Sequence, residues 1–158
     1  MLEVLARRLK GNSATLILRS PTTGEAGLLY TWGGTAEVIS QYAHRYFAMD
    51  PFVQLPEKEV ITLHDFVGAA KLEESPFFTD YLVHWDSIYH LGVDVRDEGR
   101  YYARLRVSRP RRAGNFSPAH HHLLCAGGAR DCFGIGRIGL FAQAGYPGCA
   151  TDQAGAVA

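Results

Sequence analysis

The alternation of apolar and polar side chains predicts strands near the middle of the chain. Between residues 87 and 95, tyrosine, leucine and valine alternate with histidine, glycine and aspartate, and residues 100–108 show a similar alternation with arginine and serine. A period of two is typical of a strand with one buried face. Two earlier apolar runs flank a Pro21–Gly24 turn and predict a hairpin. We therefore expect an antiparallel sheet built from residues 14–19, 25–32, 87–95 and 100–108.

Apolar residues at helical spacing predict helices between these strands. Leucines near the start of the chain predict a first short helix, and further helices are expected near 35–48, 76–85 and 118–125. Asp50–Pro51 ends the second helix, while Ser75–Pro76 and Ser117–Pro118 are helix starts. Residues 52–72 read as a long connection. The order of hairpins and helices indicates an α+β fold, an antiparallel sheet with flanking helices.

The hexapeptide "GIGRIG" at 134–139 has the spacing of a dinucleotide-binding fingerprint. That motif works only between a strand and a helix, with an acidic residue on a second strand about 20 residues later. Here it follows the glycine-rich "AGGARD", and too few residues come after it to build the second strand. We therefore expect no nucleotide cofactor.

Composition narrows the functional classes. The 158 residues contain 16 basic and 16 acidic side chains, which argues against DNA binding by this chain alone. No apolar run is long enough to span a membrane, and the start does not resemble a signal peptide. The cysteines Cys125, Cys132 and Cys149 lack metal-binding spacing and suggest reduced thiols. We expect a cytoplasmic protein with no metal and no membrane partner.

Aromatic side chains on the first hairpin, the two central helices and the third strand suggest a ligand pocket. Tyrosine and tryptophan combine an apolar ring with a polar group that needs a partner, and such residues often line small-molecule sites. We expect a cavity of about 300 Å³ or more between the sheet and helices 35–48 and 76–85. The candidate ligand-binding residues are Tyr30, Trp32, Tyr42, Tyr46, Asp50, Trp85 and Tyr89.

Other polar groups suggest weaker hypotheses. The adjacent histidines His120, His121 and His122 point in different directions on a helix and are expected to form a solvated face. An arginine series on the last strand and the following loop is expected to be an exposed sheet face; it comprises Arg104, Arg106, Arg109, Arg111 and Arg112. No nucleophile or metal motif is present, so we expect no catalytic residues and no enzyme activity.

Three segments resemble the N-terminal GAF/PAS-like sensory domain of LuxR-type helix-turn-helix transcriptional regulators. They are "YFAMDPFVQLP", "YHLGVDV" and "RPRRAGNFSPA", and the similarity runs from Leu2 to Cys125. The resemblance implies a GAF/PAS-like sensor sandwich, reception of an unknown small-molecule signal, and homodimerisation. It implies DNA binding only through a module absent from this chain. In acyl-homoserine-lactone receptors of the wider group an aromatic pair and an aspartate hold the signal, and Tyr42, Tyr46 and Asp50 stand in similar places.

The composition changes after Cys125. Residues 1–125 contain 28 charged side chains, whereas residues 126–158 contain four charges, no lysine or glutamate, and eight glycines. We interpret residues 1–125 as the sensory domain and 126–158 as an irregular glycine-rich tail produced by a shifted reading frame, which truncates the regulator before its helix-turn-helix. Two other functions stay open: a ligand-free dimerisation or interaction module, and a small-molecule enzyme.

Overall fold

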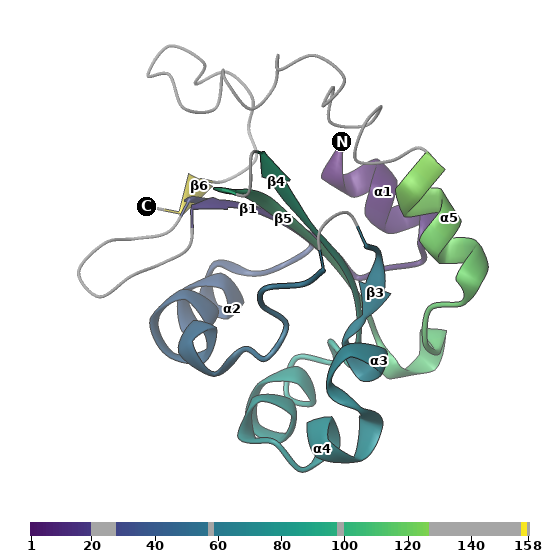
Figure 1. Cartoon of the computed structure of the whole chain (residues 1–158). Coiled ribbons are helices and arrows are strands. Elements are labelled where there is room, and N and C mark those ends of the chain that lie inside the picture. The colour runs from purple at the N-terminus through teal and green to yellow at the C-terminus, as the bar shows by residue number, and fades with distance from the viewer. Residues whose placement is uncertain (20–27, 57–58, 98–99, 127–155, 158) are drawn as a thin grey trace.

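The computed structural model describes residues 1–19, 28–56, 59–97, 100–126 and 156–157. These residues form an antiparallel sheet with helices on both faces, as the sequence predicts (Figure 1). The strand order is β3-β4-β5-β1-β2-β6. Strands β1 (Ser13–Arg19), β2 (Leu28–Trp32), β4 (Tyr89–Asp97) and β5 (Arg100–Arg109) correspond to the four expected strands, and β3 (Ile61–Thr62) and β6 (Ala156–Val157) are short additions.

The expected pairing of the last two long strands is confirmed. β4 and β5 run antiparallel from the Tyr89–Arg109 pair to the Asp97–Arg100 pair, with one irregularity after Val95. β1 lies between β5 and β2 and is antiparallel to both. The sheet therefore joins the two hairpins through a pairing of residues about 90 positions apart, which the local sequence pattern does not contain.

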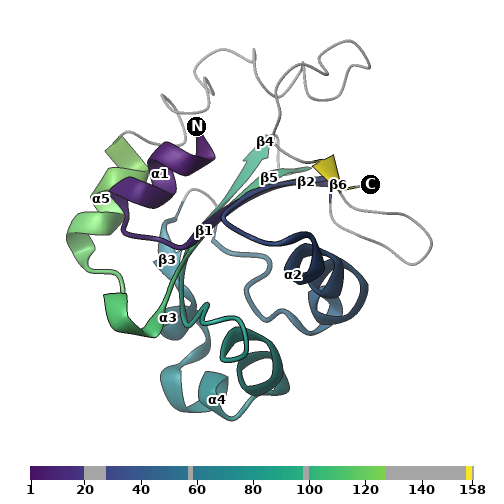
Figure 2. The ribbon, with the colours of Figure 1, turned by 180° about the vertical axis from the view of Figure 1, so that it is seen from behind.

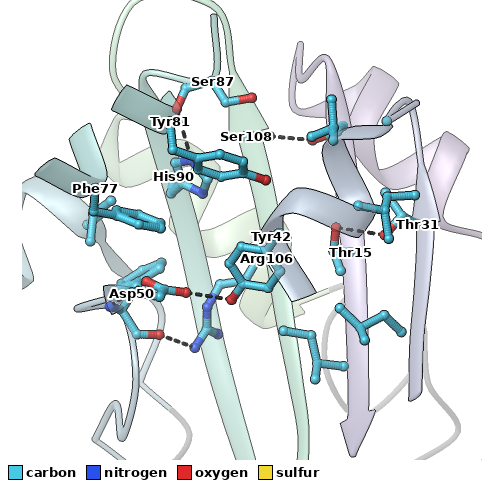
Figure 3. A pocket seen from close by; sticks show the side chains of 18 residues that line it. Thr15, Thr31, Tyr42, Asp50, Phe77, Tyr81, Ser87, His90, Arg106 and Ser108 are labelled. Atoms are coloured by element: carbon cyan, nitrogen blue, oxygen red, sulfur yellow. Dashed lines mark hydrogen bonds between the residues drawn. The ribbon is translucent and has the colours of Figure 1, made fainter. Parts of the chain in front are cut away.

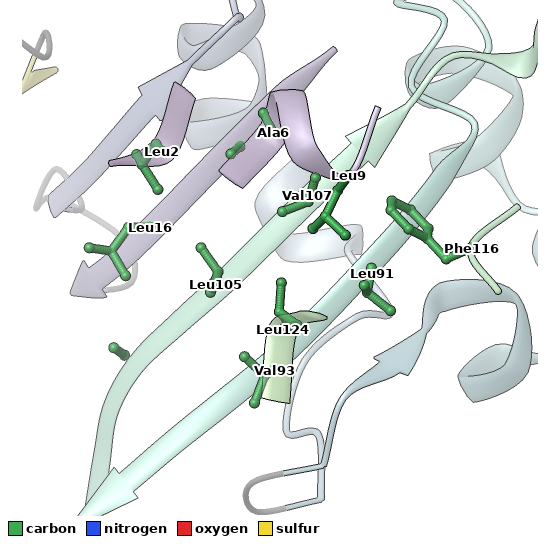
Figure 4. Close-up of a cluster of buried hydrophobic side chains, with 12 residues drawn as sticks. Leu2, Ala6, Leu9, Leu16, Leu91, Val93, Leu105, Val107, Phe116 and Leu124 are labelled. Atoms are coloured by element: carbon green, nitrogen blue, oxygen red, sulfur yellow. The ribbon is translucent and has the colours of Figure 1, made fainter. Parts of the chain in front are cut away.

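One face of the sheet packs against α1 (Leu2–Arg8) and α5 (Pro118–Ala126), which lie side by side (Figure 2). The apolar positions of the alternating strands point to this face (Figure 4). Leu91, Val93, Leu105 and Val107 are buried there with leucines of both helices. We call this cluster the α1/α5 core.

The opposite face is covered by the segments between β2 and β4. They are α2 (Ala36–Gln41), η1 (Tyr42–Tyr46), η2 (Phe47–Met49), α3 (Leu63–Val67), α4 (Ala69–Glu73) and η3 (Phe77–Leu82). The expected helix 35–48 is thus a continuous α, π and 3-10 succession, and the expected helix 76–85 is centred on a π-helix. π-Helical turns are rare and are frequently found at functional sites.

Local capping explains where these helices begin. Thr35 Oγ1 accepts from the Val38 N–H at 3.3 Å, and Thr62 Oγ1 accepts from the Asp65 N–H at 3.1 Å. Ser75 Oγ accepts from the Phe78 N–H at 3.2 Å, as expected from the Ser75–Pro76 helix start. The expectation that 52–72 is only a connection is wrong: the Thr62 cap and the buried Leu63 and Leu72 build β3, α3 and α4 there.

Several sequence features lie outside the described residues. They include "GIGRIG" at 134–139, Cys132 and Cys149, and nearly all of the tail from Ala126 onward. The expected helix 118–125 is present as α5, which extends to Ala126. Among the described residues, no helix is long and apolar enough to span a membrane, and no group of histidine, cysteine and acidic side chains is suited to hold a metal ion.

Candidate ligand-binding site

A cavity of about 80 Å³ lies between the sheet and the helices on its second face (Figure 3). Its floor comes from β1, β2, β4 and β5, and its walls come from α2, η1, the 50–52 loop, α3 and η3. The cavity lies where the aromatic pattern predicts it but is smaller than the expected 300 Å³. Because one buried water needs about 10–15 Å³ of such free volume, the cavity has room for about six water-sized groups.

Strand register arranges the polar floor of this cavity in rows. The first row runs across three strands, because Ser13 of β1 pairs with Ser108 of β5, and Ser108 pairs with His90 of β4. The second row runs across four strands in the order Thr31, Thr15, Arg106 and Gly92. Hydroxyl groups are paired within each row: Ser13 Oγ with Ser108 Oγ, and Thr15 Oγ1 with Thr31 Oγ1 at 3.1 Å.

A buried ion pair lies at one end of the floor. Arg106 Nη2 contacts Asp94 Oδ1 at 2.7 Å, and the Asp94 carboxylate also accepts from the Leu55 N–H at 3.1 Å. The same guanidinium donates to the backbone oxygens of Phe52, Val93 and Leu105 at 2.8–3.1 Å. These contacts leave little hydrogen-bonding capacity unused, as a buried charge requires.

The expectation that the arginine series forms an exposed sheet face is therefore wrong for its strand residues. Arg106 and Arg109 are buried, Arg104 is half-buried beside Asp94, and only Arg111 and Arg112 are exposed. The polar face of the strands is covered by the 36–82 segments rather than by water. Arg109 points to the opposite face, where it donates to the Leu9 oxygen at 2.6 Å and lies 4.1 Å from the Phe116 ring centroid.

Gly92 provides the space that Arg106 and Phe52 occupy. A Cβ atom at this position would lie 2.6 Å from Phe52 Cε1 and 2.9 Å from Arg106 Cδ. The Arg106 guanidinium carbon lies 4.6 Å from the Phe52 ring centroid, so the ring covers the charge. Because Gly92 has no side chain, the Arg106 side chain can lie over β4 at this position, beneath the Phe52 ring.

Tyr42 and Asp50 form a second polar pair in the cavity wall. Tyr42 Oη donates to Asp50 Oδ2 at 2.6 Å, and Asp50 Oδ1 accepts from the Phe52 N–H at 2.8 Å. Burial raises the pKa of the Asp50 carboxyl, although both hydrogen bonds act in the opposite direction. Burial and the neighbouring Asp50 charge raise the pKa of Tyr42. The Tyr42 phenol therefore keeps its proton at neutral pH and donates it to Asp50 Oδ2.

His90 contributes a neutral ring to the floor. Its Nε2 lies 2.9 Å from the Ser87 oxygen and must donate to it, which leaves Nδ1 as an acceptor in the neutral ring. Burial lowers the pKa of His90 to about 4, with Arg106 and His64 acting in the same direction and the Ser87 hydrogen bond opposing. The histidine is consequently uncharged at neutral pH.

Aromatic rings of η1 and η3 form the wall opposite the sheet. Tyr46 and Tyr81 stack with 4.6 Å between ring centroids, and Tyr81 also lies 5.9 Å from Tyr42 and 5.6 Å from Phe77. Tyr42, Phe77 and Tyr81 line the cavity, whereas Tyr46 is buried behind Tyr81. The two π-helices thus meet through their tyrosines.

The sequence-predicted site residues divide between the two faces of the sheet. Tyr42 and Asp50 line the cavity, while Tyr46 and Trp85 belong to the cluster around it. Tyr30 and Trp32 pack against the α1/α5 core, because Leu29 and Thr31, which alternate with them along β2, point to the cavity. Tyr89 contacts both clusters. Of these residues, Tyr42 and Asp50 therefore meet at the cavity, whereas Tyr30 and Trp32 do not. Ligand binding by any of the predicted residues stays a prediction.

Sequence reasoning missed most of the floor. Ser13, Thr15, His90, Arg106 and Ser108 all line the cavity. The signal that could have found three of them, His90, Arg106 and Ser108, was the polar half of the two alternating strands, whose arginines we expected to be exposed. Hydroxyl and histidine side chains in that half are compatible with burial, whereas a solvated sheet face usually carries mostly charged residues.

Comparison with known proteins identifies the fold through structure alone. No family model and no curated protein matches the sequence. The VqsR LBD domain of Pseudomonas aeruginosa is similar over 79% of this chain and 75% of that one, with 16% identity and a TM-score of 0.59. A domain of a two-component sensor histidine kinase protein from Sinorhizobium meliloti matches with 13% identity over 79% and 78% of the two chains and a TM-score of 0.53.

A third similar structure is the GAF domain/HD domain protein of Geobacter sulfurreducens. It shares 12% identity over 78% of this chain and 79% of that one, with a TM-score of 0.50. At such identities the similarity shows the fold: an α+β sandwich with a GAF-like arrangement, found in these sensory-domain structures. The expected fold class is confirmed.

Replacing Gly92 by alanine tests the packing of the ion pair. Glycine to alanine usually stabilises a compatible position by about 0.4–1 kcal/mol through the unfolded state. Here the added Cβ overlaps the Phe52 ring, so we expect a loss of about 1–3 kcal/mol in the free energy of unfolding, measured by urea denaturation. In a Phe52→Leu background the loss should shrink by at least about 0.5 kcal/mol. A stabilised Gly92→Ala protein would contradict this account.

The low pKa of His90 predicts a pH-dependent stability. Between about pH 6.5 and pH 4 the unfolded chain binds a proton at this residue and the folded chain does not, so stability falls as the pH falls. We expect proton binding by the unfolded chain at this residue to lower the free energy of unfolding by about 2 kcal/mol between pH 7 and pH 5. The His90→Gln variant keeps a donor toward Ser87, and its free energy of unfolding, measured by urea denaturation, should not show this pH-dependent loss. The exposed His44→Gln is the control, and an equal pH dependence in wild type and His90→Gln would refute the assignment.

Proposed function

We propose that this chain is the signal-receiving domain of a LuxR-type transcriptional regulator and that its cavity binds a small molecule. The observation that carries the proposal is the cavity itself, which lies between a GAF-like sheet and two aromatic π-helices. Concave sites with mostly apolar walls and a few converging polar groups are typical of small-molecule binding. The fold similarity to the VqsR LBD domain supports this function.

The LuxR-type assignment rests on the sequence resemblance, and the position of two of its three segments supports it. "YFAMDPFVQLP" supplies the Asp50 turn and Phe52, and "YHLGVDV" supplies His90, Gly92 and Asp94. Both segments therefore contribute to the cavity or its ion pair. In this proposal the domain is cytoplasmic and homodimeric, and DNA is contacted by a helix-turn-helix module that these residues do not include.

Occupancy of the cavity is testable with the protein purified from its own cells. We expect native mass spectrometry to detect a bound small molecule in the wild type. Val38 lines the cavity from α2, so Val38→Phe should fill part of it and reduce the bound fraction at least about tenfold. Glu37→Phe, at an exposed position on the same helix, should retain the molecule. A protein that never carries a ligand, or a Val38→Phe protein that retains it fully, would argue for a ligand-free interaction module.

The nucleotide sequence of the locus tests the regulatory assignment separately. We expect the DNA after codon 125 to encode, in a neighbouring frame, a helix-rich continuation that ends in a helix-turn-helix. Resequencing the locus from several isolates would show whether the frame changes there. A locus without such a continuation in any frame would exclude the truncated LuxR-type regulator and leave the small-molecule site to be judged by occupancy alone.

A further inference from the structure

The polar groups of the cavity are of two kinds, and they indicate what kind of molecule it accepts. Charged side chains at one end are neutralised by partners within the protein, whereas hydroxyl groups on the floor retain hydrogen-bonding capacity. We propose that the cavity takes a compact, uncharged molecule rich in hydroxyl or carbonyl groups, held by the Ser13–Ser108 and Thr15–Thr31 pairs. This inference rests on the proposed small-molecule function and specifies its ligand class.

Arg106 is poorly placed to bind an anion. Four of its N–H groups already face oxygen atoms, three on the backbone and one on Asp94. A guanidinium has five N–H groups, so one remains, and the two parallel hydrogen bonds that recognise carboxylate or phosphate cannot form. An anion entering the cavity would also have to displace Asp94, at the cost of leaving a buried carboxylate unpaired.

Asp50 is equally poor as a cation site. One of its oxygens accepts from the Tyr42 hydroxyl at 2.6 Å and the other from the Phe52 N–H at 2.8 Å. Its charge is further offset by Arg104 and Arg106, which both act on its carboxyl. A ligand cation placed there would meet the field of two guanidinium groups as well as one carboxylate. Neither sign of charge therefore finds an uncompensated partner in this cavity.

The hydroxyl pairs are different because each has a hydrogen to spare. Within Ser13–Ser108 one hydroxyl donates to the other, so the second O–H and further lone pairs are left for another partner. In the Thr15–Thr31 pair, too, one hydroxyl donates to the other, which leaves one O–H and further lone pairs for another partner. His90 adds an acceptor, Nδ1, in the row that contains Ser108. The floor thus offers both donors and acceptors, a combination that suits hydroxyl and carbonyl groups.

Volume and walls set the size and shape of the molecule. A cavity of about 80 Å³ holds roughly six non-hydrogen atoms on the scale of buried water. Tyr42, Phe77 and Tyr81 line it on the side opposite the sheet and offer aromatic carbon surface to a ligand. A small diol or hydroxyketone would place its oxygens on the floor and its carbons against these rings.

Three probes of about six non-hydrogen atoms test this inference: butane-2,3-diol, butyrate and butylammonium. Saturation-transfer NMR titrations of the full chain up to about 10 mM measure each affinity. We expect the diol to bind at least about tenfold more tightly than either ion. Ser108→Ala and Thr31→Ala should each weaken diol binding about fivefold, while Ser40→Ala, at an exposed position on α2, should leave it unchanged.

The outcomes separate this inference from the proposed function. Tighter binding of butyrate or butylammonium, or no binding of any probe, would overturn the ligand class. Diol binding that is unaffected in both Ser108→Ala and Thr31→Ala would overturn the role of the hydroxyl floor; because the two variants lie in different rows, misfolding of one leaves the other as a test. A charged molecule that copurifies with the wild type and is lost in Val38→Phe would uphold the sensory site and refute its uncharged ligand.

Discussion

The buried pair of Arg106 and Asp94 holds together the parts from which the cavity is made. Burying two charges costs several kcal/mol per ion, and the cost is offset only where geometry is good and further hydrogen bonds satisfy most of the remaining donors and acceptors. Here the guanidinium reaches Asp94 and the Phe52 oxygen, and Asp94 also binds the Leu55 N–H. The pair therefore fastens the 50–55 loop to the sheet. Loss of either charge would free that loop as well as leave the other charge unpaired.

The loop in turn positions the aromatic wall. Asp50 lies two residues before Phe52, and it holds the hydroxyl of Tyr42 at the start of the π-helix η1. Tyr42 and the buried Tyr46 contact Tyr81 of the second π-helix. A chain of direct contacts thus runs from the sheet to both π-helices. The α1/α5 core on the other face includes none of these residues, so the two faces of the sheet pack against different sets of side chains.

The long strands and the antiparallel pairing within each hairpin could be predicted because alternation and turn residues are local signals. The same alternation could not say whether the polar face meets water or another layer of protein. The second face of the sheet is covered by segments that include the two short helices α3 and α4, where the sequence lacks the long periodic pattern that identifies a helix. Without that layer, Arg106 and Ser108 read as surface residues. Their burial follows from tertiary packing alone.

The site was predictable only where its contacts are close in sequence, because the remaining contacts depend on the register of the strands. Tyr42 and Asp50 are eight residues apart and meet through a helix end followed by a proline turn, which the sequence signals directly. The row of Ser13, Ser108 and His90 instead depends on the register of three strands. A shift of one residue would turn each side chain to the other face. Aromatic residues were a poor guide for the same reason, because Tyr30 and Trp32 fall on the opposite phase of β2 from Leu29 and Thr31.

The hydroxyl pairs explain how a polar floor can exist beneath apolar helices. An unpartnered hydroxyl away from water costs roughly 1–3 kcal/mol, but Thr15 and Thr31 satisfy each other at 3.1 Å. These paired hydroxyls are therefore compatible with burial in a stable fold. Each pair also keeps a further O–H and lone pairs for a ligand, and one such hydrogen bond contributes about 0.5–1.5 kcal/mol. Most of the affinity must then come from carbon atoms packed on the tyrosine rings, while the hydroxyls favour molecules that can bond to them. The rings thus contribute mainly to affinity and the hydroxyl floor mainly to selectivity.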